Sequence, residues 1–150
     1  MIQSVLPTSG EYALRAVVCL AALPPDGWMT ARDLAEQANV PAAFLAKVLR
    51  RLVQHGLLEA HKGHHGGFRL ARALASVRVI DVLEAADIEL KTTHCAFGFV
   101  RCNEALPCAL HEMYRDLQLM CHTWARANTL ADVDLSRIPP LVPPPERATE

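Results

Sequence analysis

Three cysteines and one histidine lie close together in the segment HCAFGFVRCNEALPCALH, which covers residues 94–111. Six residues separate Cys95 from Cys102, five separate Cys102 from Cys108, and His111 follows three positions after the last cysteine. Thiolate sulfur and imidazole nitrogen are common ligands of zinc and of iron–sulfur clusters, and these gaps let one loop fold around a single centre. The spacing predicts a metal centre but does not separate iron from zinc.

The sequence around the cysteines also predicts how they are held. Cys108 is expected at the start of a helix, where the helix dipole favours the thiolate that a metal requires. His111 would then lie on the same helical face as Cys108, which makes it a candidate ligand. The two remaining cysteines fall in apolar helical patterns, so we expect Cys19 and Cys121 to be buried small hydrophobes.

The composition indicates a cytoplasmic, globular protein. The chain has 150 residues, of which 51% are hydrophobic, and this is enough for a single hydrophobic core. The apolar run at residues 17–23 is short and is followed by Pro24 and Pro25, so neither a membrane span nor a signal peptide is expected. Five cysteines, an odd number, favour reduced thiols over structural disulfides.

Charge is distributed unevenly along the chain. Residues 1–80 contain nine Lys and Arg against five Asp and Glu, a balance of +4, whereas residues 81–150 contain six against eleven, a balance of −5. This asymmetry predicts that the first half meets an anion such as nucleic acid, while the second half has another role.

The first half has the element order of a winged helix-turn-helix, so the predicted fold class is mainly α with a small β-hairpin. Ser9 and Thr30 are the expected N-caps of the first two helices, and the segment KGHHGG is expected to join the two strands. The predicted elements are helices at residues 12–23, 31–38 and 41–55 and strands at residues 57–61 and 68–71.

In a winged helix-turn-helix the helix after the turn enters the major groove of duplex DNA, and the wing can reach the minor groove. Basic side chains bind phosphates there, and side chains near the start of the helix meet base edges. The candidate DNA-binding residues are Ala42, Ala43, Lys47, Arg50 and Arg51 on the helix and Lys62, His64, His65 and Arg69 in the wing.

In the second half, the sequence pattern predicts a helix at residues 79–86, then the cysteine loop, and then a long helix at residues 107–128. Apolar residues step along the long helix by three and four positions, which is typical of a helix that packs on a partner helix and predicts a homodimer. They are Leu110, Met113, Leu117, Met120 and Trp124. The predicted domains are residues 1–78 for DNA binding, 79–138 for the cysteine loop and dimerisation helix, and 139–150 as a disordered tail with five prolines.

Several segments together resemble the Rrf-two family of bacterial transcription regulators, which includes IscR-type and NsrR-type iron–sulfur sensors. They are TSGEYALRA, DLAEQANVPAAFLAKVLRRLVQHGLLEA, GHHGGFRLAR, the cysteine loop and TLADVD. The resemblance covers roughly residues 8–135. It implies a homodimeric winged-helix regulator of duplex DNA whose 2Fe–2S or 4Fe–4S cluster senses iron–sulfur status, oxidants or nitric oxide.

The resemblance also suggests which group completes a cluster held by Cys95, Cys102 and Cys108. The spacing of His111 resembles the IscR-type arrangement, whereas Glu11 matches an acidic position that NsrR-like members supply from the partner subunit. Two features differ from the family pattern. Ala42 and Ala43 replace a proline and a polar residue that often begin the recognition helix, and the first cysteine gap is six residues where many members have five.

Two other functions use the same residues. One is a cluster-free regulator that contains zinc or switches between thiols and a disulfide. The other is a small iron–sulfur electron carrier, which would leave the basic helix-turn-helix unexplained. An enzyme is not expected, because no catalytic dyad is recognisable in the sequence.

Overall fold

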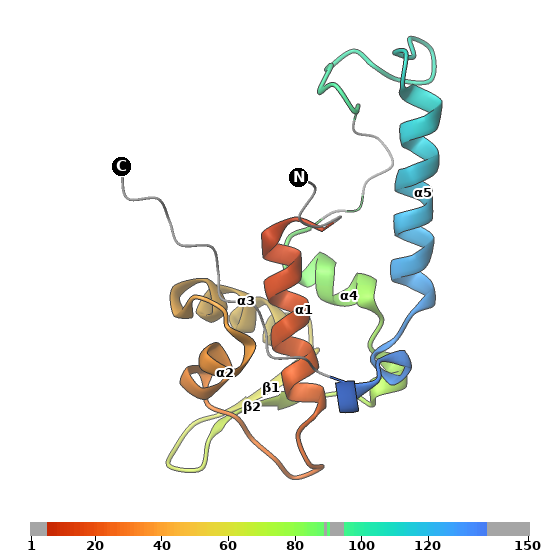
Figure 1. The fold of residues 1–150 in the computed structure, drawn as a ribbon. Coiled ribbons are helices and arrows are strands. Elements are labelled where there is room, and N and C mark those ends of the chain that lie inside the picture. The colour runs from red at the N-terminus through yellow and green to blue at the C-terminus, as the bar shows by residue number, and fades with distance from the viewer. Residues whose placement is uncertain (1–5, 89, 91–94, 138–150) are drawn as a thin grey trace.

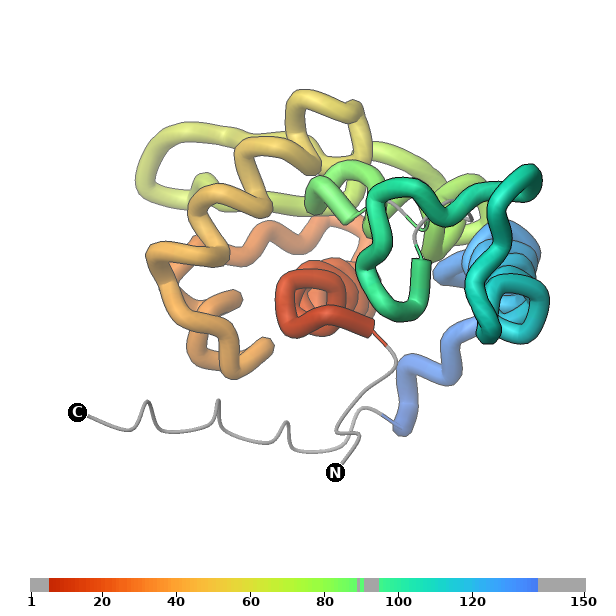
Figure 2. Tube along the Cα trace, turned by 90° about the horizontal axis from the view of Figure 1, so that it is seen from above, coloured from red at the N-terminus to blue at the C-terminus, as the bar shows by residue number. Residues whose placement is uncertain are grey.

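Helix α1 (Thr8–Ala21) lies at the centre of the molecule, with the other elements of the DNA-binding half arranged around it (Figure 1). The computed structural model describes residues 6–88, 90 and 95–137. Among these residues, α2 (Ala31–Ala38) and α3 (Ala42–Gln54) lie on one side of α1, and α5 (His111–Ala127) lies on the opposite side, as the view from above also shows (Figure 2). The predicted Pro-rich tail at residues 139–150 falls outside the described residues.

α1 begins earlier than its apolar pattern predicts. The helix starts at Thr8 and its N-cap is Pro7, so Ser9 lies within the first turn and is not the cap. Gly10 is buried there, and a Cβ on it would meet the ends of Ile88 and Leu83 at 3.0 and 3.1 Å. The extra turn therefore forms where a small residue lets the helix approach α4 (Val79–Ala85) and the segment that follows it, which is a tertiary effect.

The helix-turn-helix follows the predicted boundaries closely. In α2 (Ala31–Ala38) the N-cap Thr30 accepts a hydrogen bond from the backbone N–H of Asp33 at 3.1 Å, and Asn39 ends the helix with a left-handed φ of 49°. The next helix, α3 (Ala42–Gln54), begins directly after Pro41. Its apolar face is buried in the core through Leu45, Val48, Leu49 and Leu52.

The wing is an antiparallel hairpin of β1 (Leu58–His61) and β2 (Gly67–Leu70). A third backbone segment supports it, because the N–H groups of Met29 and Phe68 each donate to the other residue's carbonyl, at 3.1 and 2.8 Å. Gly67 adopts a φ of 146°, and a Cβ at this position would overlap the carbonyl group of Met29. Glycine is therefore required where the wing meets the body of the domain.

The remaining helices are α4 (Val79–Ala85) and α5 (His111–Ala127). The end of α5 is attached to the start of α4, since the N–H of Val79 donates to the carbonyl of Asn128 at 2.9 Å and that of Leu130 donates to Val77 at 2.9 Å. Ala125 and Leu130 join the same hydrophobic core as α1 to α4. Most of α5 extends away from that core and carries the cysteine loop at its far end (Figure 1).

Replacing Gly67 by alanine should destabilise the protein through two effects, an unfavourable φ and the overlap with Met29. Gly63 is the matched control, because it has a φ of 119° but a Cβ there would meet no atom within 4 Å. We expect Gly63→Ala to cost about 1 kcal/mol from backbone strain. Gly67→Ala should cost roughly 1–3 kcal/mol more because the overlap must be relieved. Equal losses in urea unfolding would contradict this account.

Candidate metal centre and nucleic-acid interface

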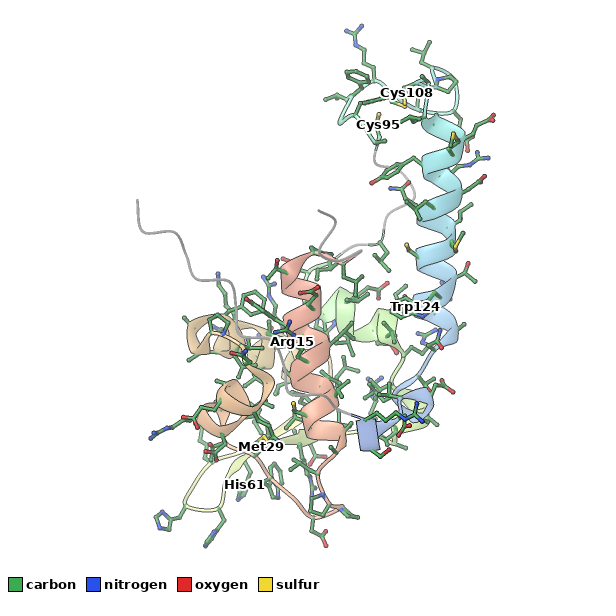
Figure 3. All side chains as sticks on the ribbon, viewed as in Figure 1. Arg15, Met29, His61, Cys95, Cys108 and Trp124 are labelled. Carbon is green, nitrogen blue, oxygen red and sulfur yellow. The ribbon has the colours of Figure 1, made fainter. Side chains whose placement is uncertain are left out.

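The three cysteines of the loop converge on one point. The Sγ atoms of Cys95, Cys102 and Cys108 all lie within 4.8 Å of one another, and those of Cys95 and Cys108 are 3.6 Å apart. Figure 3 shows Cys95 and Cys108 together at the end of α5 that is remote from Trp124. All three side chains are half-buried, so the loop encloses the sulfur atoms without sealing them from solvent.

Short turns between the cysteines produce this convergence. The N–H of Gly98 donates to the carbonyl of Cys95 at 3.0 Å, and Gly98 has the left-handed φ of 70° that such a turn favours. The N–H of Cys102 donates to Phe99, which places the second cysteine after another turn. The side chain of Asn103 then accepts from the N–H groups of Ala105 and Leu106, at 2.9 and 3.0 Å, and folds the chain towards Cys108.

Cys108 precedes α5 and is not helical, which differs from the prediction. The helix begins at His111, and its N-cap is Leu110. The N–H of His111 donates to the carbonyl of Cys108 at 3.0 Å, so a turn and not a shared helical face relates the two residues. Residues 107–110 do not extend the helix because the chain there bends to bring Cys108 next to Cys95.

His111 nevertheless lies at the cysteine site. Its Nδ1 is 3.2 Å from the Sγ of Cys102, although His111 is not part of the set of mutually close ligand atoms. Its Nε2 is buried and has no hydrogen-bond partner among the described residues. A buried ring nitrogen without a partner beside three clustered thiols is a donor set that fits a thiophilic metal or an iron–sulfur cluster.

The thiols differ in how readily they ionise. Partial burial raises the pKa of the Cys95 thiol. Hydrogen bonds from the backbone N–H groups of Phe99 and Phe97 and from the thiols of Cys108 and Cys102 together more than offset this and hold that pKa below its usual value. For Cys102, the backbone N–H of Cys108 favours the thiolate, yet burial and the neighbouring thiols outweigh it and raise the pKa. The loop therefore favours the thiolate at Cys95 more than at Cys102, and the thiolate is the form that a metal binds.

Glu11 is not brought to the cysteines within one chain. It lies in the first turn of α1, and its Oε2 is 3.9 Å from Nη2 of Arg15. In Figure 1 the cysteine loop lies beyond the far end of α5, well away from α1. Of the two cysteines outside the loop, Cys19 is buried and its burial raises the pKa of its thiol, whereas Cys121 is half-buried on α5.

The recognition helix exposes one continuous line of side chains. Ala42, Ala43, Lys47 and Arg50 are all exposed, which is a condition for the contact with DNA that the sequence predicts. Ala46 and Gln54 extend the same line and were not among the predicted residues, although their helical spacing from Ala43 and Arg50 was visible in the sequence. Lys47 and Arg50 make no ion pair with a described carboxylate.

Two of the predicted DNA-binding arginines are engaged within the chain. Nη2 of Arg51 lies 3.1 Å from a carboxylate oxygen of Asp87, so this side chain is directed towards the end of α4. Arg69 donates to Glu59 at 2.9 and 3.0 Å and lies over the ring of Trp28, with 4.4 Å from its guanidinium carbon to the ring centroid. Sequence reasoning missed these partners because each lies on another element.

The tip of the wing remains accessible. Lys62, His64 and His65 are exposed, and the two histidine rings lie 5.8 Å apart in an edge-on arrangement. Behind the tip, the side chain of Arg72 donates to backbone carbonyls at the end of α3, a contact that the sequence did not reveal.

α5 carries an exposed apolar stripe formed by the residues that were predicted to contact a partner helix. These residues are Leu110, Met113, Leu117, Met120 and Trp124. The most exposed are Met113 and Met120, with 72% and 67% of their surface accessible to solvent. A second exposed apolar group lies in the cysteine loop, where the rings of Phe97 and Phe99 are 5.5 Å apart and Val100 is fully exposed. Clusters of exposed apolar side chains are typical of interaction sites.

The chain is similar to known transcription regulators over most of its length. It is 27% identical to the HTH-type transcriptional regulator IscR of Yersinia pestis over 85% of this chain and 77% of that protein. Its fold matches CymR, the global cysteine regulator of B. subtilis, with a TM-score of 0.70, 19% identity and coverage of 87% and 95%. It also matches IscR of T. potens with a TM-score of 0.68, 21% identity and coverage of 87% and 86%.

No helix in the described part of the chain is long and apolar enough to cross a membrane. A sequence model described as Rrf2, iron-dependent transcriptional regulator, matches residues 6–134. The winged helix-turn-helix, the exposed face of α3 and this match agree with one another. The chain therefore belongs to the Rrf2 family of transcription regulators, whose members bind DNA.

Proposed function

We propose that the protein is a homodimeric transcription regulator whose DNA affinity depends on an iron–sulfur cluster bound by the cysteine loop. The observation that carries the proposal is the convergence of three Sγ atoms within 4.8 Å of one another in a chain of this family. The name of the Yersinia pestis relative, IscR, supports the same assignment. The signals to which the cluster would respond are iron–sulfur status, oxidants or nitric oxide.

The cluster would be held by Cys95, Cys102 and Cys108, with His111 as the fourth ligand. His111 is the better candidate because one ring nitrogen lies 3.2 Å from Cys102 and the other is buried without a described partner. Glu11 would need to come from the partner subunit. When bound, the cluster supplies a centre that oxidants and nitric oxide can alter, and the loop supplies amide donors that stabilise sulfur charge.

DNA binding is assigned to the exposed line of α3 together with the tip of the wing. Ala42 and Ala43 would meet base edges, and the exposed side chains of Lys47, Arg50 and Lys62 would bind phosphates. His64 and His65, at the tip of the wing, would enter the minor groove. We propose that Arg51 and Arg69 hold this surface in place and do not bind phosphates, because each already forms an ion pair with a carboxylate of the chain.

Dimerisation is assigned to the apolar stripe of α5. The stripe repeats at helical spacing, and in a single chain its side chains would remain exposed to water. Packing two copies of α5 against each other would bury the stripe on both. The same contact would connect two cysteine loops with two DNA-binding domains, since α5 joins the loop to the start of α4. A change in the loop could then alter the separation of the two recognition helices.

A cluster-free regulator is the second candidate. It is favoured by the 3.6 Å separation of the Cys95 and Cys108 sulfur atoms and by the fold match to CymR of Staphylococcus aureus in a structure described as its oxidized form. In this version the loop would contain zinc, or would cycle between two thiols and a disulfide. Purification without oxygen separates these functions, because only an iron–sulfur protein would be brown with visible absorbance.

Anaerobic reconstitution with iron and sulfide should produce that absorbance in the wild type. Replacing Cys95, Cys102 or Cys108 by alanine should abolish it, because the loop has only these three cysteines and two thiolates would be too few to hold the cluster. Cys121→Ala is the matched control and should retain the full spectrum. We expect His111→Ala to alter the spectrum and Glu11→Ala to leave it unchanged. A colourless wild type containing stoichiometric zinc would instead support the cluster-free regulator.

The salt dependence of DNA binding should separate phosphate contacts from supporting arginines. For a duplex selected from a random-sequence library, Lys47→Gln, Arg50→Gln or Lys62→Gln should each reduce the slope of log affinity against log salt by about 0.9. Arg51→Gln and Arg69→Gln should leave the slope unchanged, since Asp87 and Glu59 already pair with these side chains. An equal reduction in all five variants would mean that the ion pairs open on DNA.

Replacing Leu117 by glutamate should convert the dimer to monomers. A buried leucine side chain contributes roughly 1.5–3 kcal/mol, and a charge in its place cannot be buried without a partner. Leu119 is the control, because it is similarly exposed but projects about 140° away around the helix from the centre of the stripe. Sedimentation should give monomers for Leu117→Glu and dimers for Leu119→Glu. The reverse result would place the interface on the other face of α5.

A further inference from the structure

The corner between the recognition helix and the wing is built from very few residues. α3 ends at Gln54 with His55 as its C-cap, and Gly56 follows with a left-handed φ of 67°. Two backbone hydrogen bonds close the turn, from Gly56 to the carbonyl of Val53 at 3.0 Å and from Leu57 to that of Leu52 at 2.9 Å. The chain then enters β1 at Leu58. The direction of the wing relative to α3 therefore depends on this turn, together with the pairing of Phe68 with Met29.

The side chain of Arg72 joins both sides of the corner. Its Nε donates to the carbonyl of Gly56 at 3.0 Å and its Nη2 donates to the carbonyl of His55 at 3.3 Å. Arg72 itself follows the end of β2, where the N–H of Ala71 donates to the carbonyl of Leu57 at 3.0 Å. One guanidinium thus connects the chain leaving the wing with the chain entering it.

The chemistry of the corner suits arginine. Carbonyl groups at the end of a helix lack helical partners and carry the negative end of the helix dipole. A planar guanidinium can donate to two of them at once in a fixed geometry, which an ammonium group cannot do. No described carboxylate lies within ion-pairing distance of Arg72, so these carbonyls are its hydrogen-bonded partners in the described part of the chain.

We infer that Arg72 is a positioning residue for DNA binding, which sets the orientation of the wing relative to the recognition helix. The inference rests on the proposed DNA interface, because it requires α3 and the tip of the wing to contact one duplex together. Arg72 acts through the backbone of His55 and Gly56, and its own side chain contacts no phosphate. Loss of its hydrogen bonds lets the wing tip move relative to α3 and weakens simultaneous contact.

The first test measures binding to a duplex selected from a random-sequence library with the wild-type protein. Arg72→Gln should lower affinity roughly tenfold, because two charge-assisted hydrogen bonds are lost, while the salt slope stays at the wild-type value. Arg72→Lys should recover part of the loss. Arg137→Gln, which removes the same charge far along the chain, should bind like the wild type. A slope reduced by about 0.9 would make Arg72 a phosphate contact and overturn the inference, as would unchanged affinity.

The second test needs no DNA and separates the inference from the proposed function. Hydrogen exchange of the Ala71 amide, which closes the base of the wing, should be about tenfold faster in Arg72→Gln than in the wild type. The amide of Val17 in the centre of α1 should exchange at an unchanged rate. Unchanged exchange at Ala71 would overturn the inference even if the protein binds DNA. If the wild-type protein selects no duplex from the library, the proposed DNA interface is wrong. The positioning role of Arg72 in DNA binding would then be wrong as well.

Discussion

Burial of α1 is the constraint on which the rest of the structure depends. Ala13, Ala16 and Val17 are completely buried, and α1 contacts α2, α3, α4 and the second strand of the wing. Small residues on this helix let its neighbours approach closely, most clearly at Gly10, where Leu83 and Ile88 pack against the backbone. Because α3 and α4 share α1 as their support, the recognition surface and the helix that receives the end of α5 belong to one packed unit.

The basic side chains of α3 and of the wing region divide into two groups with different physical roles. Arg51, Arg69 and Arg72 lie near carboxylates or carbonyl groups of other elements and connect α3, the wing and the end of α4. Exposed ion pairs contribute little to stability individually, so their main effect is on geometry. Lys47 and Arg50 remain exposed on the free face of α3. A positive balance in the sequence therefore overstates the charge that is available to a phosphate.

Local signals predicted the elements better than the contacts between them. Thr30, Asn39 and Gly56 are chemical signals for helix ends, and the boundaries of α2 and α3 followed them. The start of α1 was missed because the reason for it, the packing of Gly10 on Ile88, is far away in the sequence. The sequence also predicted three cysteines at one centre but not the local turns that replace the expected helix at Cys108. The partner of Arg51 was missed because Asp87 lies on another element.

A β-bridge between Arg78 and Thr129 joins the start of α4 to the end of α5. The chain therefore returns, at the end of α5, to the place where α4 begins. The cysteine loop and most of α5 form an excursion that follows α4 and extends away from the hydrophobic core (Figure 1). Its length, its cysteines and its apolar stripe can therefore change during evolution without moving the ends, and a sensor of one kind can replace another on an unchanged DNA-binding unit.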